Sequence, residues 1–187
     1  SDVCSSDLKS FVDIPKFIHT EEHPRLNTGA SHSAFLKISE GCVRNCSFCV
    51  IPKLRGHEVR SRSISSLVQE AKRLALGGVT ELNLVVQDLT HYGIGNDYRE
   101  NLAMLLRELV KIEKLRWIRL HYAYPDNFTD EVIDLIATEP KIAKYVDMPL
   151  QHGDDKVLKL MNRRVTRAQI YSLVEKMRSE EHTSELQ

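Results

Sequence analysis

Short apolar runs alternate with helix-like patterns along most of this chain, and this alternation limits the folds that it can adopt. The apolar runs predict strands at residues 34–39, 82–87, 117–121 and 145–150. Helical spacing of apolar residues predicts helices at residues 65–76, 101–112, 130–137, 154–161 and 166–177, and the last opens with a Thr166-x-x-Gln169 capping box. Such alternation is typical of right-handed βα units on a parallel sheet. The sequence therefore predicts an α/β fold of about four βα units.

Chemically active side chains follow each predicted strand. A loop with three cysteines follows the first strand, and the pairs Gln87-Asp88, His121-Tyr122 and Gln151-His152 lie at the carboxyl ends of the other three. In parallel α/β folds the functional site lies at the carboxyl ends of the strands. We therefore expect these groups to meet at one edge of the sheet.

The cysteine loop carries Cys42, Cys46 and Cys49 at C-x3-C-x2-C spacing, with Phe48 just before the third cysteine. Thiolate is the usual protein ligand of iron–sulfur clusters, so three thiolates on one loop predict ligands for three irons of a cubane 4Fe–4S cluster. The fourth iron is then left open to a cofactor or substrate, as at a catalytic zinc.

A structural zinc site is the main alternative, but such sites usually have four ligands in two short pairs. His57 is a possible fourth ligand, yet a Pro-, Gly- and Arg-containing loop separates it from Cys49. The close spacing and the lack of a signal peptide disfavour disulfides.

The two ends of the chain match translations of opposite strands of one DNA segment. Residues 178–187 match AGATCGGAAGAGCACACGTCTGAACTCCAG, a sequencing-library adapter, and residues 1–8 match the reverse complement of its start. We expect both tails to be adapter-derived and exclude them, with Cys4, from fold reasoning. Residues 34–177 are then an incomplete domain, and residues 9–33 a linker from a missing N-terminal domain.

Charge and hydropathy set further limits. The full chain has 26 basic and 26 acidic residues, and without the tails 25 and 21 remain, a net charge of +4. This balance is compatible with an anionic cofactor but does not predict direct nucleic-acid binding. No apolar stretch approaches the length of a membrane span, so we expect a cytoplasmic protein that does not bind membranes.

Several motifs carry a resemblance to a known family. They are Leu-Lys-Ile-Ser-Glu-Gly-Cys at 36–42, the cysteine loop, Ile51-Pro52, Arg55-Gly56, Arg60-Ser61-Arg62, Gln-Asp-Leu-Thr-His-Tyr-Gly at 87–93, Arg-Leu-His-Tyr-Ala-Tyr-Pro at 119–125, and Pro-Leu-Gln-His-Gly at 149–153. Over residues 24–177 the chain resembles the radical S-adenosylmethionine (SAM) methylthiotransferases. Three of its loops are most similar to the branch that modifies ribosomal protein S12.

The resemblance implies a TIM-like (βα) barrel of the radical-SAM type, truncated here after about four βα units. It implies that Cys42, Cys46 and Cys49 hold a 4Fe–4S cluster whose open iron chelates SAM. Electron transfer from the cluster would cleave SAM to a 5′-deoxyadenosyl radical, which abstracts hydrogen from the β-carbon of an S12 aspartate. Phe48, Gln87 and Asp88 correspond to SAM-contacting positions of the family.

Gln151 and His152 are assigned to cofactor binding because a buried polar pair at a strand end needs partners. The implied partners of the intact enzyme are ribosomal protein S12 and an electron donor. A second cluster domain, a later strand and a C-terminal β-barrel belong to the family pattern beyond this chain. We therefore expect the chain alone to be inactive in methylthiolation.

Alternatives stay open for the function and for individual residues. The competing functions are modification of adenosine in transfer RNA, the chemistry of a single-cluster radical-SAM enzyme, and zinc binding without catalysis. The basic residues Arg55, His57, Arg60 and Arg62 are assigned to cofactor charge neutralisation or to solvated ion pairs, with a preference for function. Tyr122 and Tyr124, with His121, either line the substrate pocket or pack at a strand end. We expect residues 162–164 to form a solvated turn.

Overall fold

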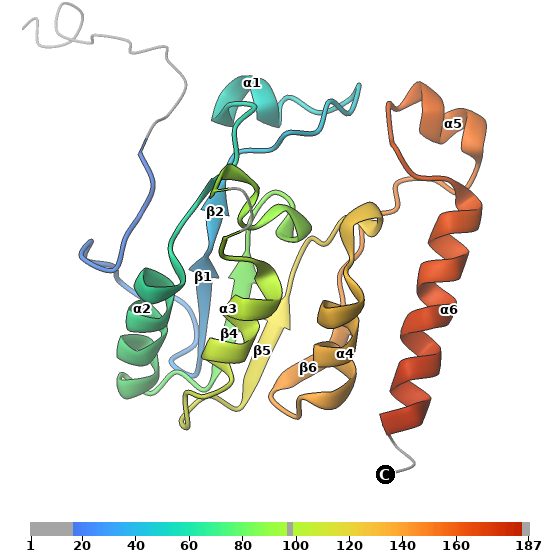
Figure 1. The fold of residues 1–187 in the computed structure, drawn as a ribbon. Coiled ribbons are helices and arrows are strands. Elements are labelled where there is room, and N and C mark those ends of the chain that lie inside the picture. The colour runs from blue at the N-terminus through green and yellow to red at the C-terminus, as the bar shows by residue number, and fades with distance from the viewer. Residues whose placement is uncertain (1–16, 97–98, 185–187) are drawn as a thin grey trace, which may run out of the picture.

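A computed structural model describes residues 17–96 and 99–184, so the predicted tail at 1–8 lies outside the described residues. Four parallel strands form its main sheet in the order β1-β4-β5-β6 (Figure 1). These strands are β1 (Ser33–Lys37), β4 (Glu81–Val85), β5 (Trp117–Leu120) and β6 (Ile142–Val146). The predicted α/β fold with a parallel sheet is therefore confirmed.

The connecting helices follow the predicted pattern closely. They are α2 (Ile64–Leu76), α3 (Leu102–Leu109), α4 (Asp130–Thr138), α5 (Asp155–Leu160) and α6 (Arg167–Ser184). Side-chain oxygens of Ser63, Asn101 and Thr129 accept hydrogen bonds at the starts of α2, α3 and α4. The predicted capping box before α6 is present, because the Gln169 amide donates to Thr166 Oγ1 and the Thr166 amide donates to Gln169 Oε1.

The hydrophobic core lies between the sheet and helices α2, α3 and α4, which pack on one face of it (Figure 1). Leu36, Leu84 and Leu120 project from neighbouring strands into this core, where Leu67 and Leu105 meet them from α2 and α3. On the other face Phe35 and Tyr145 are exposed. Helices α2, α3 and α4 thus cover one face of the sheet (Figure 1). The functional site of a parallel sheet is expected at the carboxyl ends of its strands.

Two short strands and one helix shape the cysteine loop and were not predicted. β2 (Ser39–Glu40) pairs antiparallel with β3 (Arg60–Ser61), and α1 (Ile51–Arg55) follows the third cysteine. The first predicted strand, 34–39, is divided at Ile38, because residues 39–40 pair with β3 and not with β4. The β2–β3 pair therefore joins the segment before the cysteine loop to the segment after α1.

The prediction of the fourth strand at 145–150 is wrong in its bounds. β6 begins earlier, where Ile142 pairs with Ile118 and is buried, and it ends at Val146. Residues 147–150 leave the ladder, since Pro149 has no N–H to donate. The Asp147 carbonyl instead accepts a hydrogen bond from the Ala123 amide at 2.9 Å.

Further single turns complete the fold. In the residues that the structure describes, three 3₁₀ turns, η1 (Leu89–His91), η2 (Ile94–Asn96) and η3 (Pro125–Asn127), follow β4 and β5. No helix in the described part of the chain is both long and apolar enough to cross a membrane.

Candidate metal and cofactor site

A cavity of about 270 Å³ opens where the strands end and the cysteine loop begins. It is lined by Cys42, Arg44, Cys46, Phe48, Cys49, Ile51, Val86, Gln87, Asp88, Tyr122, Tyr124, Gln151 and Arg163. Seven of the eight residues assigned to metal or cofactor binding are therefore brought to one cavity from three separate loops. The convergence expected from a parallel sheet is present here.

His152 is the assigned residue that the cavity lining does not include. Its side chain is exposed, and its Nδ1 accepts a hydrogen bond from the Asp154 amide at 2.9 Å, just before α5. The neighbouring Gln151 lines the cavity with a left-handed backbone, φ 72°, but it is exposed as well, so the prediction of a buried polar pair is wrong. The side chain of Gln151 thus lies at the cavity, whereas that of His152 lies at the start of α5.

The cysteine loop is shaped by a tight turn at Gly41. This residue has φ 94°, and a Cβ built on it would lie 2.0 Å from the carbonyl oxygen of Glu58. Only glycine fits such a position. Cys42 follows directly and is buried, while Cys46 and Cys49 are partly exposed, and all three thiols are free. Burial raises the pKa of the Cys42 thiol above its usual value.

The donor set fits a cubane cluster better than a single ion. In the described residues, no three cysteine, histidine, aspartate or glutamate side chains are arranged to hold one metal ion. Ligands of a cubane bind different irons, so they need to surround a volume and not to converge on one point. Three free thiols around one cavity, joined by a turn in which the Cys49 amide donates to the Cys46 carbonyl at 3.0 Å, meet that condition.

Gln87 ties the end of β4 to the start of the cysteine loop. Its Oε1 accepts a hydrogen bond from the Gly41 amide at 3.1 Å, and its Nε2 donates to Glu40 Oε1 at 2.9 Å. Both ends of the side-chain amide are therefore engaged by the residues that precede Cys42. The contact seen for Gln87 positions the loop, and its assignment to SAM stays a prediction.

Asp88 is buried and joins three loops. Its carboxylate accepts from Arg44 Nε at 2.9 Å, from the Thr90 hydroxyl at 2.7 Å and from the Tyr124 amide at 3.4 Å. Arg44 belongs to the cysteine loop and also pairs with Asp126 in η3. Asp88 thus holds the cysteine loop against the ends of β4 and β5, and its assignment to SAM likewise stays a prediction.

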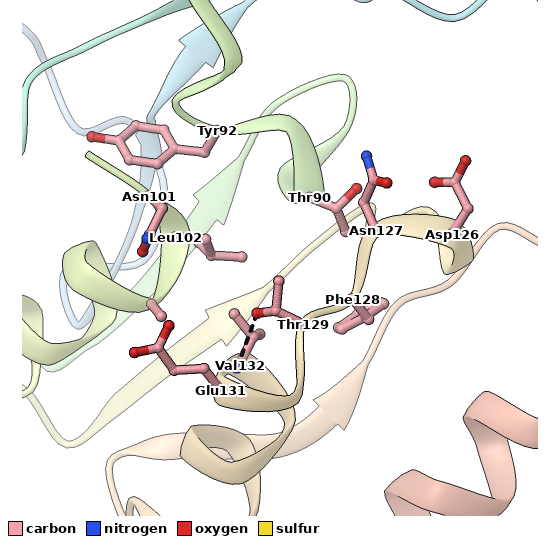
Figure 2. Close-up of a pocket in the computed structure, with 11 residues that line it drawn as sticks. Thr90, Tyr92, Asn101, Leu102, Asp126, Asn127, Phe128, Thr129, Glu131 and Val132 are labelled. Carbon is pink, nitrogen blue, oxygen red and sulfur yellow. Dashed lines mark hydrogen bonds between the residues drawn. The ribbon is translucent and has the colours of Figure 1, made fainter. Parts of the chain in front are cut away.

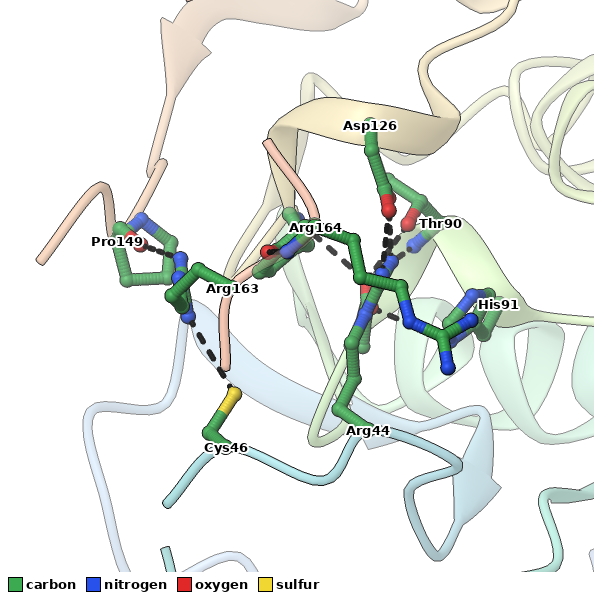
Figure 3. A network of polar contacts seen from close by, with 10 residues as sticks. Arg44, Cys46, Thr90, His91, Asp126, Pro149, Arg163 and Arg164 are labelled. Carbon is green, nitrogen blue, oxygen red and sulfur yellow. Dashed lines mark hydrogen bonds and ion pairs between the residues drawn. The ribbon is translucent and has the colours of Figure 1, made fainter. Parts of the chain in front are cut away.

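Two arginines of the site were missed by sequence reasoning. Arg163 is 9% exposed, so the expectation of a solvated turn at 162–164 is wrong for this residue. Figure 3 shows its guanidinium between the Pro149 carbonyl and the Cys46 sulfur. Arg44 and Arg163 both lie on the ring of Tyr124, 3.7 and 4.1 Å from its centroid. No local pattern marks Arg163, because its partner Cys46 lies 117 positions earlier.

The basic run after the cysteine loop makes other contacts. Arg62 is buried and pairs with Glu70 at 2.6 Å, while Arg60 donates to the Arg55 carbonyl at 3.3 Å. His121 Nε2 lies 3.1 Å from Asn83 Oδ1, away from the cavity lining. These contacts hold the loop and the sheet together, whereas Tyr122 and Tyr124 do line the cavity.

A second, larger cavity of about 510 Å³ lies at the starts of α3 and α4 (Figure 2). None of the assigned metal or cofactor residues lines it. Two of its polar side chains, Asn101 and Thr129, cap α3 and α4, since they accept from the Met104 and Val132 amides at 2.9 and 3.4 Å. The residues assigned to metal and cofactor binding therefore belong to the cysteine-lined cavity and not to this one.

Comparison with known proteins agrees with this site. Residues 36–183 match the Radical SAM superfamily. A protein named "Ribosomal protein uS12 methylthiotransferase RimO" from Citrifermentans bemidjiense is 52% identical over 166 residues, which are 89% of this chain and 37% of that protein. A protein of the same name from Geobacter sulfurreducens is 48% identical over 170 residues, 91% of this chain and 38% of that protein. The chain thus spans less than two fifths of the length of these relatives.

Solved structures show a similar fold. The radical S-adenosylmethionine methyltransferase TsrM from Kitasatospora setae, with tryptophan substrate and a SAM analog bound, has a TM-score of 0.62 at 22% identity. The match covers 81% of this chain and 29% of that one. A second TsrM structure, with cobalamin and a [4Fe-4S] cluster bound, has a TM-score of 0.61 at 23% identity and covers 79% and 29%. At this identity the likeness concerns the fold.

Proposed function

The chain belongs to the radical SAM superfamily, and from this premise we propose that it is part of a methylthiotransferase acting on ribosomal protein S12. The observation that carries the proposal is the cavity at the strand ends, where three free cysteines meet residues from the β4 and β6 loops. In this proposal Cys42, Cys46 and Cys49 would hold three irons of a 4Fe–4S cluster at this cavity, and the cluster would supply an open iron for SAM.

The residues around the cysteines have separate tasks. When bound, the cluster and SAM supply the radical chemistry, and the protein binds, orients and shields them. Gln87 and Asp88 hold the cysteine loop against the sheet through the contacts described above. Phe48, Ile51, Val86 and Tyr122 give the cavity an apolar wall against which the cofactor can pack. Gln151 offers a side-chain amide to the polar end of SAM.

The S12 substrate is supported by sequence similarity. Curated proteins about half identical to this chain carry the name of uS12 methylthiotransferase. The loop motifs at Gln87-Asp88, His121-Tyr122 and Gln151-His152 resemble the same branch. The proposal places the enzyme in the cytoplasm, where a reducing environment protects the cluster, and gives it an electron donor as a further partner.

The test uses the full-length protein that contains this chain, expressed in a strain that lacks its own gene. Mass spectrometry of S12 and nucleoside analysis of transfer RNA are measured in parallel. We expect a methylthio group on an S12 aspartate with the wild type and none with Cys49→Ala. The control Val50→Ala changes an exposed neighbour outside the cavity lining and keeps the modification.

The other outcomes separate the alternatives. A methylthio group on transfer RNA adenosine, with S12 unchanged, assigns the chain to the tRNA-modifying branch. SAM cleavage without sulfur insertion on either substrate indicates a single-cluster radical-SAM enzyme. Anaerobically prepared protein that holds zinc and leaves SAM intact reduces the site to a metal-binding module.

A further inference from the structure

Arg163 lies beside the sulfur of Cys46 although the two residues are far apart in the chain. Its Nη1 donates to Cys46 Sγ at 3.9 Å, and its Nη2 donates to the carbonyl of Pro149 (Figure 3). The guanidinium therefore bridges the cysteine loop and the segment that follows β6. A planar fork with fixed donors suits this double contact, because both bonds form in one orientation.

The turn between α5 and α6 holds Arg163 in place. Asn162 takes a left-handed conformation, φ 53°, and its Nδ2 donates to the Asn45 carbonyl at 2.6 Å. From the other side, the Ser47 amide donates to the Met161 carbonyl and the Ser47 hydroxyl to the Leu160 carbonyl, both at 3.1 Å. These hydrogen bonds attach the turn to the cysteine loop at Asn45 and Ser47, on both sides of Cys46. They therefore fix the position of the Arg163 guanidinium.

The charge of Arg163 is not balanced by a carboxylate. Its neighbour on the Tyr124 ring, Arg44, pairs with both Asp88 and Asp126. Arg163 is buried in the same cavity, yet among the residues that the structure describes it forms no ion pair with an acidic side chain. Burying an unpaired cation is costly, so a nearby negative charge is needed to offset the desolvation.

We propose that Arg163 is a positioning residue that raises the reduction potential of the cluster by donating a hydrogen bond to the Cys46 thiolate. This inference rests on the proposed ligation of iron by Cys46. A cluster held by thiolates becomes more negative on reduction, and a buried cation with a hydrogen bond to sulfur stabilises the reduced form more than the oxidised form. The cluster in turn supplies the negative charge that the guanidinium lacks.

The experiment measures the reduction potential of the cluster in the full-length protein by EPR-monitored titration. The signal followed is the one that changes on addition of SAM, because SAM binds the cluster with the open iron. Three variants are compared with the wild type. Arg163→Met removes charge and donors at similar length, Arg163→Lys keeps the charge without the fork, and Arg164→Met removes the same charge from an exposed neighbour.

We expect Arg163→Met to shift the potential to more negative values. At a fixed applied potential its ratio of reduced to oxidised cluster should fall at least tenfold, which is about 59 mV for a one-electron couple. Arg163→Lys should lie between Arg163→Met and the wild type, and Arg164→Met should match the wild type. Iron content is measured on every sample, so that loss of the cluster is not read as a shift.

A purely structural role for Arg163 predicts unequal iron content but equal potentials, and that result overturns the inference. If Arg163→Met binds no cluster, the test uses Arg163→Lys. A reduction potential equal to that of the wild type then overturns the inference, and a more negative reduction potential supports it. An equal shift in Arg164→Met refutes it as well, since net charge would then explain the effect. A wild type with no SAM-sensitive signal contradicts the proposed function itself, and the inference falls with it.

Discussion

Replacing Gly41 by alanine should disrupt the protein far more than the same change at Gly78, a glycine with a similar φ. Gly41 has φ 94° and Gly78 has φ 101°, so alanine is strained at both positions, by about 1–3 kcal/mol. Only at Gly41 does the new Cβ meet a backbone carbonyl, that of Glu58, at 2.0 Å. At Gly78 nothing lies within 4 Å. Overpacking should therefore add about 1–3 kcal/mol at Gly41 alone.

The assay compares thermal unfolding and iron content of the two variants in the full-length protein. For a domain of this size, 1 kcal/mol corresponds to about 2–4 °C, so Gly41→Ala should melt about 2–12 °C below Gly78→Ala. The Glu58 carbonyl can move only by shifting the backbone that also places Cys42, so Gly41→Ala should lose iron while Gly78→Ala retains it. Equal melting temperatures together with equal iron content would refute this reasoning.

Three further predictions concern the polar contacts of the site. Asp88→Asn should lower the free energy of unfolding by about 1.5–3 kcal/mol, because Arg44 keeps only Asp126 as a charged partner. Urea denaturation of the full-length protein measures this change, and an unchanged free energy would contradict a stabilising role of the Arg44–Asp88 pair. Gln87→Ala removes two hydrogen bonds to Glu40 and Gly41, the residues just before Cys42, so the iron content after anaerobic reconstitution should fall. An iron content equal to that of the wild type would show that Gln87 does not position the cysteine loop. Burial lowers the pKa of His91 below its ordinary value of about 6.5, so below that pH the unfolded chain binds a proton that the folded chain does not. Stability should therefore decline as the pH falls from about 7 to 5, and a pH series on His91→Gln should show a shallower decline.

The features that the sequence predicted correctly are those set by local pattern. The capping box at Thr166 and Gln169 involves neighbours three residues apart, so its hydrogen bonds could be read directly. The parallel sheet followed from alternating strands and helices, and the gathering of Cys42, Gln87 and Gln151 followed from the geometry of such sheets.

The features that it missed depend on pairing between distant segments. The fourth strand was placed too late because its start is set by the pairing of Ile142 with Ile118, while Met148 and Leu150 extend the apolar pattern beyond Val146. Arg163 looked like a surface residue because nothing near it in the chain indicates burial. Its place is decided by a turn that docks on a loop more than a hundred residues earlier.

SAM cleavage by the anaerobically reconstituted full-length protein tests the central claim most directly. The measurement is the formation of 5′-deoxyadenosine under reducing conditions for the wild type, Cys46→Ala and Val50→Ala. The account predicts product from the wild type and from Val50→Ala, and none from Cys46→Ala. Undiminished product from Cys46→Ala would show that the cysteine-lined cavity is not where SAM is cleaved.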